Sequence, residues 1–118
     1  MNETEHLDRV FSALADPTRR AILARLAEGD ATVSELAEPF DISQPTISKH
    51  LRVLEEAGLI TQGRDAQRRP RTLVVGGALA SADAWIAPFR AQWERRLDRL
   101  ETFLGKKKRD KKQENKKS

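Results

Sequence analysis

The sequence predicts a mainly α-helical domain of about five helices with one small β-hairpin. Apolar residues recur at the spacing of an α-helix along most of the chain. Residues that cap helices, namely Asp16, Thr32 and Ser43, stand ahead of three of these segments. Two short β-prone stretches, at 59–62 and 72–75, flank a polar loop and predict the hairpin. A chain of 118 residues is long enough for one small domain with a modest core.

The first two predicted helices have the features of a structural scaffold. Asp16 followed by Pro17 ends the first helix and starts the second, as N-cap and first helical residue. One apolar stripe runs along the first helix and consists of Leu7, Val10, Phe11 and Leu14. In the second helix the residues expected to turn inward are Ile22, Leu23 and Leu26.

The middle of the chain predicts two short helices joined by a tight turn. Thr32 stands three residues before Glu35, so the two side chains can form a capping box where the first of these helices starts. Ser43 can cap the second helix, and Pro45 is tolerated in its first turn because no intrahelical donor is needed there. Gly58 suits the left-handed position just past the end of that helix. This layout is typical of a DNA-reading helix-turn-helix.

The second of these helices has two contrasting faces. Ile47, Leu51 and Leu54 recur at i, i+4 and i+7 and form the side expected to be buried. Small side chains on the other side let the helix backbone approach a major groove, and donors there can reach base edges or phosphates. The alternative interpretation is an ordinary packing corner between two helices of another all-helical domain. The groups on the outer side and first turn are short, polar or positive: Gln44, Pro45, Thr46, Ser48, Lys49 and Arg52.

The segment after Gly58 predicts a β-hairpin with a basic tip. The polar loop between its two β-prone stretches contains Gly63, Pro70 and four arginines. Such arginines can lie along the phosphate backbone beside the groove, as the wing of a winged helix does. The alternative is a solvated loop whose arginines only keep it soluble. The four residues are Arg64, Arg68, Arg69 and Arg71.

The last predicted helix carries more apolar surface than one small domain would bury. The surplus indicates a partner, and we expect its two tryptophans in a dimer core rather than in a ligand cage. Pro88 removes a helical donor, so it should kink this helix or mark its true start. The stripe consists of Trp85, Phe89, Trp93, Leu97, Leu100 and Leu104.

Charge is divided unevenly along the chain. Residues 106–118 hold eight Lys or Arg and two acidic residues, a net charge of +6 within a total of +4. The remainder therefore has a net charge of −2, and its positive groups must act by placement. We expect one domain over residues 1–105, followed by a disordered lysine-rich tail over 106–118. The tail either adds sequence-independent attraction to phosphates or is an inert solubilising end.

Several classes of function are disfavoured by what the sequence lacks. A chain without cysteine has no disulfides, thiolate metal sites or thiol redox sensing. No apolar run approaches the roughly 20 residues that span a bilayer. No charged-then-apolar leader opens the chain, so we expect a cytoplasmic protein without membrane contact. Ser48 and His50, two residues apart on a helix, do not face each other, and no glycine-rich phosphate loop or H-E-x-x-H motif occurs. We therefore expect no enzyme.

Four stretches can be compared with known families: FSALADPTRRAILARL, TVSELAEPFDISQPTISKHLRVLEEAGLI, GRDAQRRPR and WIAPFRAQWERRLDRLETFL. From about Phe11 to Leu104 the chain resembles the ArsR (ArsR/SmtB-type) winged helix-turn-helix repressors, and most closely the branch that lacks metal ligands. The first two stretches are specific signatures and the last two are looser. The segment VVGGALASADA is the least typical part.

The resemblance implies a mode of DNA binding. In this family the helix that here spans roughly residues 44–57 lies in the major groove, and the wing arginines touch the phosphate backbone. His50 is then either a phosphate or base contact or a helix-packing residue. By resemblance the positions near double-stranded DNA are Gln44, Pro45, Ser48, Lys49, His50 and Arg52.

The resemblance also implies a two-fold homodimer through the first and last helices. This would place two recognition helices about one turn of DNA apart, roughly 34–36 Å. The expected function is a repressor that binds an inverted-repeat operator. A winged helix used for protein docking, or a ligand- or metal-responsive member, are the alternatives. The candidate interface residues are Leu7, Val10, Phe11, Trp85, Phe89, Trp93, Leu97, Leu100 and Leu104.

Metal sensing is disfavoured by the residues at the family's metal positions. Members that sense metals use cysteines near the helix at 33–38, or carboxylate and histidine pairs on the final helix, and this chain offers neither. Its histidines are His6 and His50, and apolar Val53 and Leu54 stand where a second ligand to His50 would be needed. We expect no metal and no cofactor, and the inducer is left open.

Overall fold

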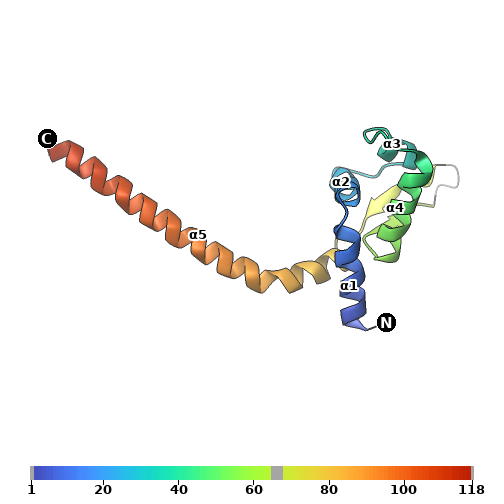
Figure 1. The fold of residues 1–118 in the computed structure, drawn as a ribbon, viewed down its shortest axis with the longest axis horizontal. Coiled ribbons are helices and arrows are strands. Elements are labelled where there is room, and N and C mark those ends of the chain that lie inside the picture. The colour runs from blue at the N-terminus through green and yellow to red at the C-terminus, as the bar shows by residue number, and fades with distance from the viewer. Residues whose placement is uncertain (1, 65–67, 118) are drawn as a thin grey trace. The chain divides into compact units, whose positions relative to one another are not determined.

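The computed structural model describes the backbone of residues 2–64 and 68–117 and the side chains as far as Gly105. Five helices and one β-hairpin make up the described chain, which confirms the mainly α-helical class and the hairpin (Figure 1). No helix in these ranges is both long enough and apolar enough to cross a membrane. The elements in chain order are α1 (Glu3–Leu14), α2 (Pro17–Leu26), α3 (Val33–Ala37), α4 (Gln44–Glu56), β1 (Ile60–Gln62), β2 (Arg71–Leu73) and α5 (Ala78–Lys117).

The helix ends follow from local hydrogen bonds, as the sequence predicts. The Asp16 carboxylate accepts a hydrogen bond of 3.0 Å from the Arg19 backbone amide at the start of α2. Thr32 and Glu35 form the predicted capping box ahead of α3. Ser43 caps α4, with proline tolerated in the first turn. Gly58 follows the end of α4 with φ +78°, the left-handed conformation that glycine adopts at little cost.

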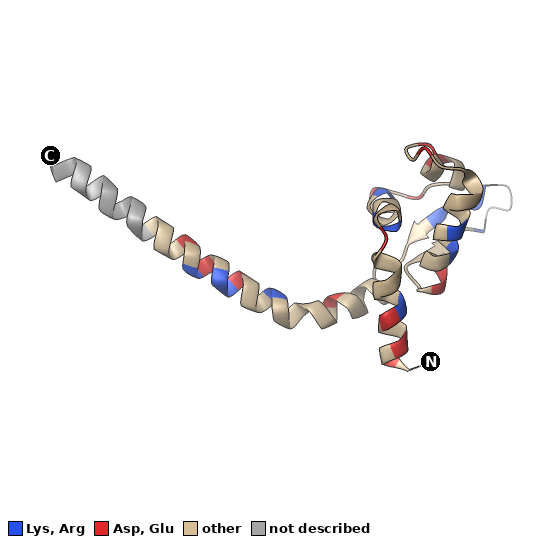
Figure 2. Ribbon diagram, viewed as in Figure 1, with Lys and Arg blue, Asp and Glu red and all other residues tan. Residues whose placement is uncertain are grey.

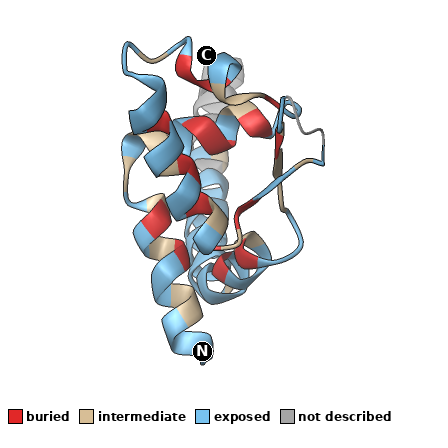
Figure 3. Ribbon diagram, turned by 90° about the vertical axis from the view of Figure 1, so that its right-hand side faces the viewer, coloured by how far each residue is buried: buried red, intermediate tan, exposed pale blue. Residues whose placement is uncertain are grey.

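Two compact units divide the chain, residues 1–83 and residues 84–118. In the first unit the buried faces of the helices gather around one apolar core, as Figure 3 shows. Val10 is wholly buried in this core. The expectation that Val10 faces a dimer partner is therefore wrong, because its side chain is already covered by its own unit. The largest fully buried side chains are Ile22, Leu36, Ile47, Leu51, Leu54, Leu59 and Val10.

The hairpin is anchored at its base. β1 and β2 are antiparallel, with Ile60 opposite Leu73 and Gln62 opposite Arg71, so each strand lies within about two residues of its predicted position. The Arg71 backbone amide donates a hydrogen bond of 2.7 Å to the Ala31 carbonyl, and the Ala31 amide donates one of 3.2 Å to the Arg71 carbonyl. Ala31, ahead of α3, therefore pairs with β2 through an antiparallel β-bridge.

Helix α5 begins at Ala78, directly after Gly76 and Gly77, because glycine is a poor helix former. Ala78 and Ala82 on its first turns lie in the core of the first unit. Pro88 lies inside the helix, so it does not mark the helix start.

The backbone of α5 continues to Lys117 without a break at Gly105. Lys, Arg, Glu and Gln are strong helix formers, and residues 106–117 contain no proline or glycine, which accounts for the helical backbone there. The expectation of one domain over residues 1–105 followed by a disordered lysine-rich tail stays a prediction.

Candidate nucleic-acid interface

The outer face of α4 is the central feature of this surface. Ile47, Leu51 and Leu54 are buried, which confirms the predicted division of the helix into two faces. Helix α3 packs against α4, and the Gln44 amide donates a 3.2 Å hydrogen bond to the Ser34 hydroxyl. The predicted outward residues Gln44, Pro45, Thr46, Ser48, Lys49 and Arg52 are all exposed.

The electrostatics of α4 favour an anionic partner at its N-terminal half. No acidic residue occupies its first turn, where the helix dipole places partial positive charge. Lys49 and Arg52 follow on the exposed side, whereas Glu55 and Glu56 come only at the last turn. Figure 2 shows Lys and Arg on α4 and on the neighbouring β2 strand. The cationic residues of α4 and its first turn, which has no acidic residue, therefore lie together.

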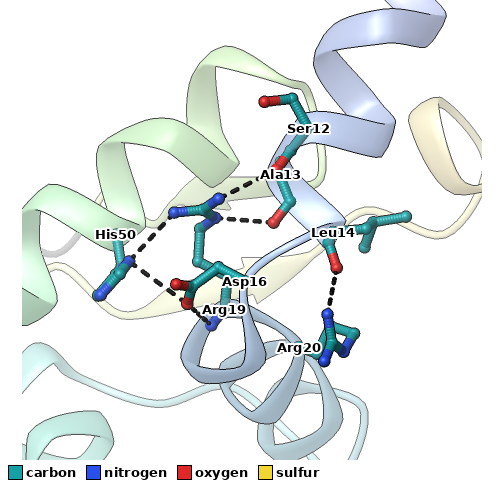
Figure 4. Close-up of polar contacts among 7 residues, drawn as sticks. All are labelled: Ser12, Ala13, Leu14, Asp16, Arg19, Arg20 and His50. Carbon is teal, nitrogen blue, oxygen red and sulfur yellow. Dashed lines mark hydrogen bonds and ion pairs between the residues drawn. The ribbon is translucent and has the colours of Figure 1, made fainter.

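His50 lies on the side of α4 that packs against its own unit. Its Nδ1 atom is 3.4 Å from the Arg19 guanidinium and 3.9 Å from the Asp16 carboxylate (Figure 4). The imidazole side chain is 21% exposed. Of the two roles expected for His50, these contacts favour helix packing, and its contact with DNA stays a prediction. The reason is that His50 is one residue beyond the outward Lys49, and this rotation about the helix axis points its side chain toward Asp16 and Arg19.

Two arginines that the sequence reasoning missed hold the corner between α1 and α2. Arg19 donates from Nε to the Ala13 carbonyl at 2.7 Å and from Nη2 to the Ser12 carbonyl at 3.0 Å. Arg20 donates to the Leu14 carbonyl at 2.8 Å (Figure 4). These carbonyls lie in the last turn of α1, where few backbone donors remain, and the arginines supply donors there; the Ser12 carbonyl also accepts from the Ala15 amide at 3.2 Å. The signal in the sequence was the Arg-Arg pair one turn into α2.

The charge at this corner has a direct effect on Asp16. The hydrogen bond from the Arg19 backbone amide lowers the pKa of the Asp16 carboxyl, and the nearby His50 and Arg19 charges lower this pKa further. The ionised carboxylate thus stabilises the start of α2 directly beneath His50 of α4. The corner holds one side of the recognition-type helix in place.

The four wing arginines do not share one role. Arg64, Arg68 and Arg69 are exposed, as expected for residues that approach a phosphate backbone. Arg71 is only 8% exposed, and its Nε donates to the Glu55 carboxylate of α4 at 2.9 Å. The expectation that Arg71 lies along DNA is therefore wrong, because its guanidinium is turned inward against α4. The intervening residues 65–67 lie outside the described residues.

A polar groove of about 560 Å³ runs between the start of α3 and the wing. On the α3 side, hydrogen bonds from the Thr32 hydroxyl and amide lower the pKa of the Glu35 carboxyl, with a smaller lowering from the charges of Arg25 and Arg68. Within residues 2–64 and 68–105, no cluster of three or more His, Cys, Asp or Glu could hold a metal ion. The groove is lined by Thr32, Val33, Ser34, Glu35, Arg68, Arg69 and Arg71.

Comparison with known proteins identifies the family of this chain. A helix-turn-helix domain model matches residues 14–63, which include α2, α3, α4 and β1. The transcriptional repressor SdpR of Bacillus subtilis (strain 168) is 48% identical over 61 residues, which are 52% of this chain and 68% of that repressor. A crystal structure of an ArsR family transcriptional regulator has 43% sequence identity and a TM-score of 0.68, covering 77% of this chain and 93% of the other. The chain belongs to the ArsR family.

As an ArsR-family chain, the protein is a DNA-binding transcriptional regulator and not an enzyme. The resemblance inferred from its motifs is confirmed. A solution structure from Mycobacterium bovis is 25% identical, with a TM-score of 0.58, and covers 81% of this chain and 85% of the other. That protein is described as a homodimeric winged helix-turn-helix DNA-binding domain and a possible ArsR-family regulator.

Proposed function

We propose that this ArsR-family chain represses transcription by binding, as a homodimer, to an inverted repeat in double-stranded DNA. The observation that carries the proposal is the outer face of α4, which is exposed, free of acidic residues in its first turn and supported by a fully buried apolar stripe. A helix mounted in this way presents its N-terminal half to a major groove without loss of core packing.

In this proposal the exposed residues of α4 make two kinds of contact with DNA. Gln44 and Ser48 read base edges, because short polar side chains near the start of a recognition helix reach into the groove. Lys49 and Arg52 supply charge toward phosphates. The exposed wing arginines Arg64, Arg68 and Arg69 contact the phosphate backbone beside the groove.

The dimer of this proposal uses the apolar residues that one chain leaves uncovered. Leu7 and Phe11 of α1 are half-buried, whereas the stripe of α5 from Trp85 to Leu104 is exposed. The homodimeric Mycobacterium bovis neighbour supports a two-fold assembly of this kind. Two recognition helices related by a two-fold axis bind half-sites about one helical turn apart, so the operator is an inverted repeat.

The test is footprinting on the duplex upstream of the chain's own reading frame, followed by affinity titrations of the protected site. Gln44→Ala should weaken binding to that site by about 1–3 kcal/mol and relax the preference for it over random duplex. Lys49→Ala should weaken both duplexes alike and flatten the salt dependence by about 0.9 log units per log of salt, equivalent to one phosphate.

Ser81→Ala is the matched control, since Ser81 is exposed on the first unit outside α4 and the wing. Its affinity and salt dependence should equal those of the native chain. If the Gln44 and Lys49 variants behave like this control, α4 does not present this face to DNA. Protection of a site without inverted symmetry would reject the homodimeric operator.

A further inference from the structure

One carboxylate on α4 joins both strands of the wing. Glu55, in the last turn of the helix, accepts a hydrogen bond of 2.9 Å from Arg71 Nε on β2. Its two oxygens also lie 3.1 and 3.4 Å from the Gln62 amide nitrogen on β1, which donates to them. Gln62 and Arg71 face each other across the hairpin. A single side chain of the recognition helix therefore holds a cross-strand pair of the wing.

The Glu55–Arg71 pair is largely shielded from water. The Arg71 side chain is 10% exposed and the Glu55 side chain 27% exposed. A charge-assisted hydrogen bond in such surroundings is stronger than an exposed surface pair, because solvent and salt screen it less. Removal of one partner would also leave the other charge partly buried without compensation. The pair is therefore suited to hold β2 in a fixed position against α4.

Arg71 also contacts the backbone that precedes it. Its Nη1 donates to the Arg69 carbonyl. Arg69 has φ +39°, an uncommon value for a residue with a side chain, and it stands before Pro70, which favours an extended backbone at the preceding residue. Such conformations persist where the surrounding contacts hold them. The Gly63 amide closes the hairpin with a 2.7 Å hydrogen bond to the Pro70 carbonyl.

We propose that Glu55 and Arg71 are positioning residues that fix the wing relative to α4, so that the exposed wing arginines and the outer helix face engage one duplex together. Neither side chain contacts DNA in this role. The inference rests on the proposed DNA-binding function and assigns to the inward arginine a task distinct from that of its exposed neighbours.

The sign of one substitution separates positioning from simple charge. Glu55→Gln removes a negative charge, so electrostatics alone would tighten binding to a polyanion. Loss of the wing's anchor would instead weaken binding, since Arg64, Arg68 and Arg69 would no longer be held beside the groove. We expect affinity for a random-sequence duplex to fall about threefold to tenfold, with a shallower salt dependence because fewer phosphates are contacted.

The control is Glu56→Gln on the neighbouring residue. The Glu56 side chain is exposed and makes no hydrogen bond or ion pair with the side chains described over residues 2–64 and 68–105. It undergoes the same change of charge and should bind as tightly as the native chain or slightly more tightly. Gln62→Ala, at an exposed position, removes only the second contact of Glu55 and should give a smaller loss. This milder variant provides the measurement if Glu55→Gln impairs folding.

The decisive experiment repeats Glu55→Gln in a chain whose three exposed wing arginines are alanine, with duplex affinity measured below the unfolding midpoint of every variant. If the pair acts through the wing, Glu55→Gln costs affinity in the native background and almost none in the alanine background. An equal loss in both backgrounds, or binding as tight as that of Glu56→Gln, overturns the positioning role while leaving DNA binding intact. Absence of duplex binding by the unsubstituted chain would overturn the proposed function as well.

Discussion

The two compact units use apolar residues in opposite ways. In the first unit, leucines and isoleucines such as Leu51 and Ile22 are buried, and the exposed face of α4 is polar and cationic. In the second unit, α5 exposes an apolar stripe. Trp93, for example, is 59% exposed. The stripe Trp85–Leu104 recurs at helical spacing, so it is a continuous face rather than scattered residues.

The difference shows which unit buries most of its own apolar side chains. A closed core leaves the first unit free to present a polar surface, although Leu7 and Phe11 of α1 stay half-buried. Exposed aromatic and aliphatic residues in one stripe are instead typical of an interface, because their burial gains about 25 cal/mol per Å². The contrast fits a first unit that binds DNA, and it supports the proposal that α5 joins two copies of the chain.

The largest effect is expected from the core of the first unit. Leu51→Ala removes buried methyl groups beneath the outer face of α4 and leaves a cavity, so it should lower the free energy of unfolding by about 2–5 kcal/mol. Urea unfolding followed by circular dichroism measures this loss. Val75→Ala, at a side chain that is 68% exposed, is the control and should change stability by less than about 0.5 kcal/mol. Equal effects at the two positions would contradict the picture of a closed core.

The second effect concerns the stripe of α5. Leu97→Glu places a charge in the middle of the apolar face, where desolvation on pairing is unfavourable, and should weaken self-association at least about tenfold, or 1.4 kcal/mol. Sedimentation velocity measures the shift from dimer to monomer, and urea unfolding should show little change in the first unit.

Ala91→Glu is the matched control for that substitution. Ala91 is exposed and lies on the opposite side of α5 from the middle of the stripe, so the same charge should leave the dimer intact. A monomeric native chain, or equal weakening by both variants, would show that the stripe has another use.

The smallest effect is expected at the corner beneath α4 and depends on pH. The folded pKa of Asp16 is lowered, so its ionised form stabilises the fold above the unfolded value of about 3.8, and this contribution is lost as pH falls through the folded pKa. Asp16→Asn should therefore lower the unfolding temperature near neutral pH, and its difference from the native chain should disappear in acid. Thermal unfolding at a series of pH values tests this.

Asp30→Asn provides the comparison for the corner, since Asp30 is exposed in the loop between α2 and α3. Its unfolding temperature should match that of the native chain across the same pH series. A deficit in Asp16→Asn that persists unchanged into strong acid would mean that the carboxylate charge is not what stabilises the corner.

Most helix boundaries and both faces of α4 could be predicted because they depend on neighbours in the chain. A cap joins residues three apart, as Thr32 and Glu35 show, and a helical face repeats every three or four residues. The position of Gly58 follows from its own backbone freedom. These features need no knowledge of what packs against them.

The sequence by itself determined the helices, the hairpin and the cationic outer face of the chain, since short-range hydrogen bonds and periodic apolar residues specify them. Only the tertiary structure decided which of the similar side chains turn inward. Arg71 meets Glu55 sixteen residues away, and His50 meets Arg19 thirty-one residues away. Pairings at such separations depend on how the helices pack, so an arginine that anchors the wing and one that faces solvent look alike until the fold brings a carboxylate to one of them.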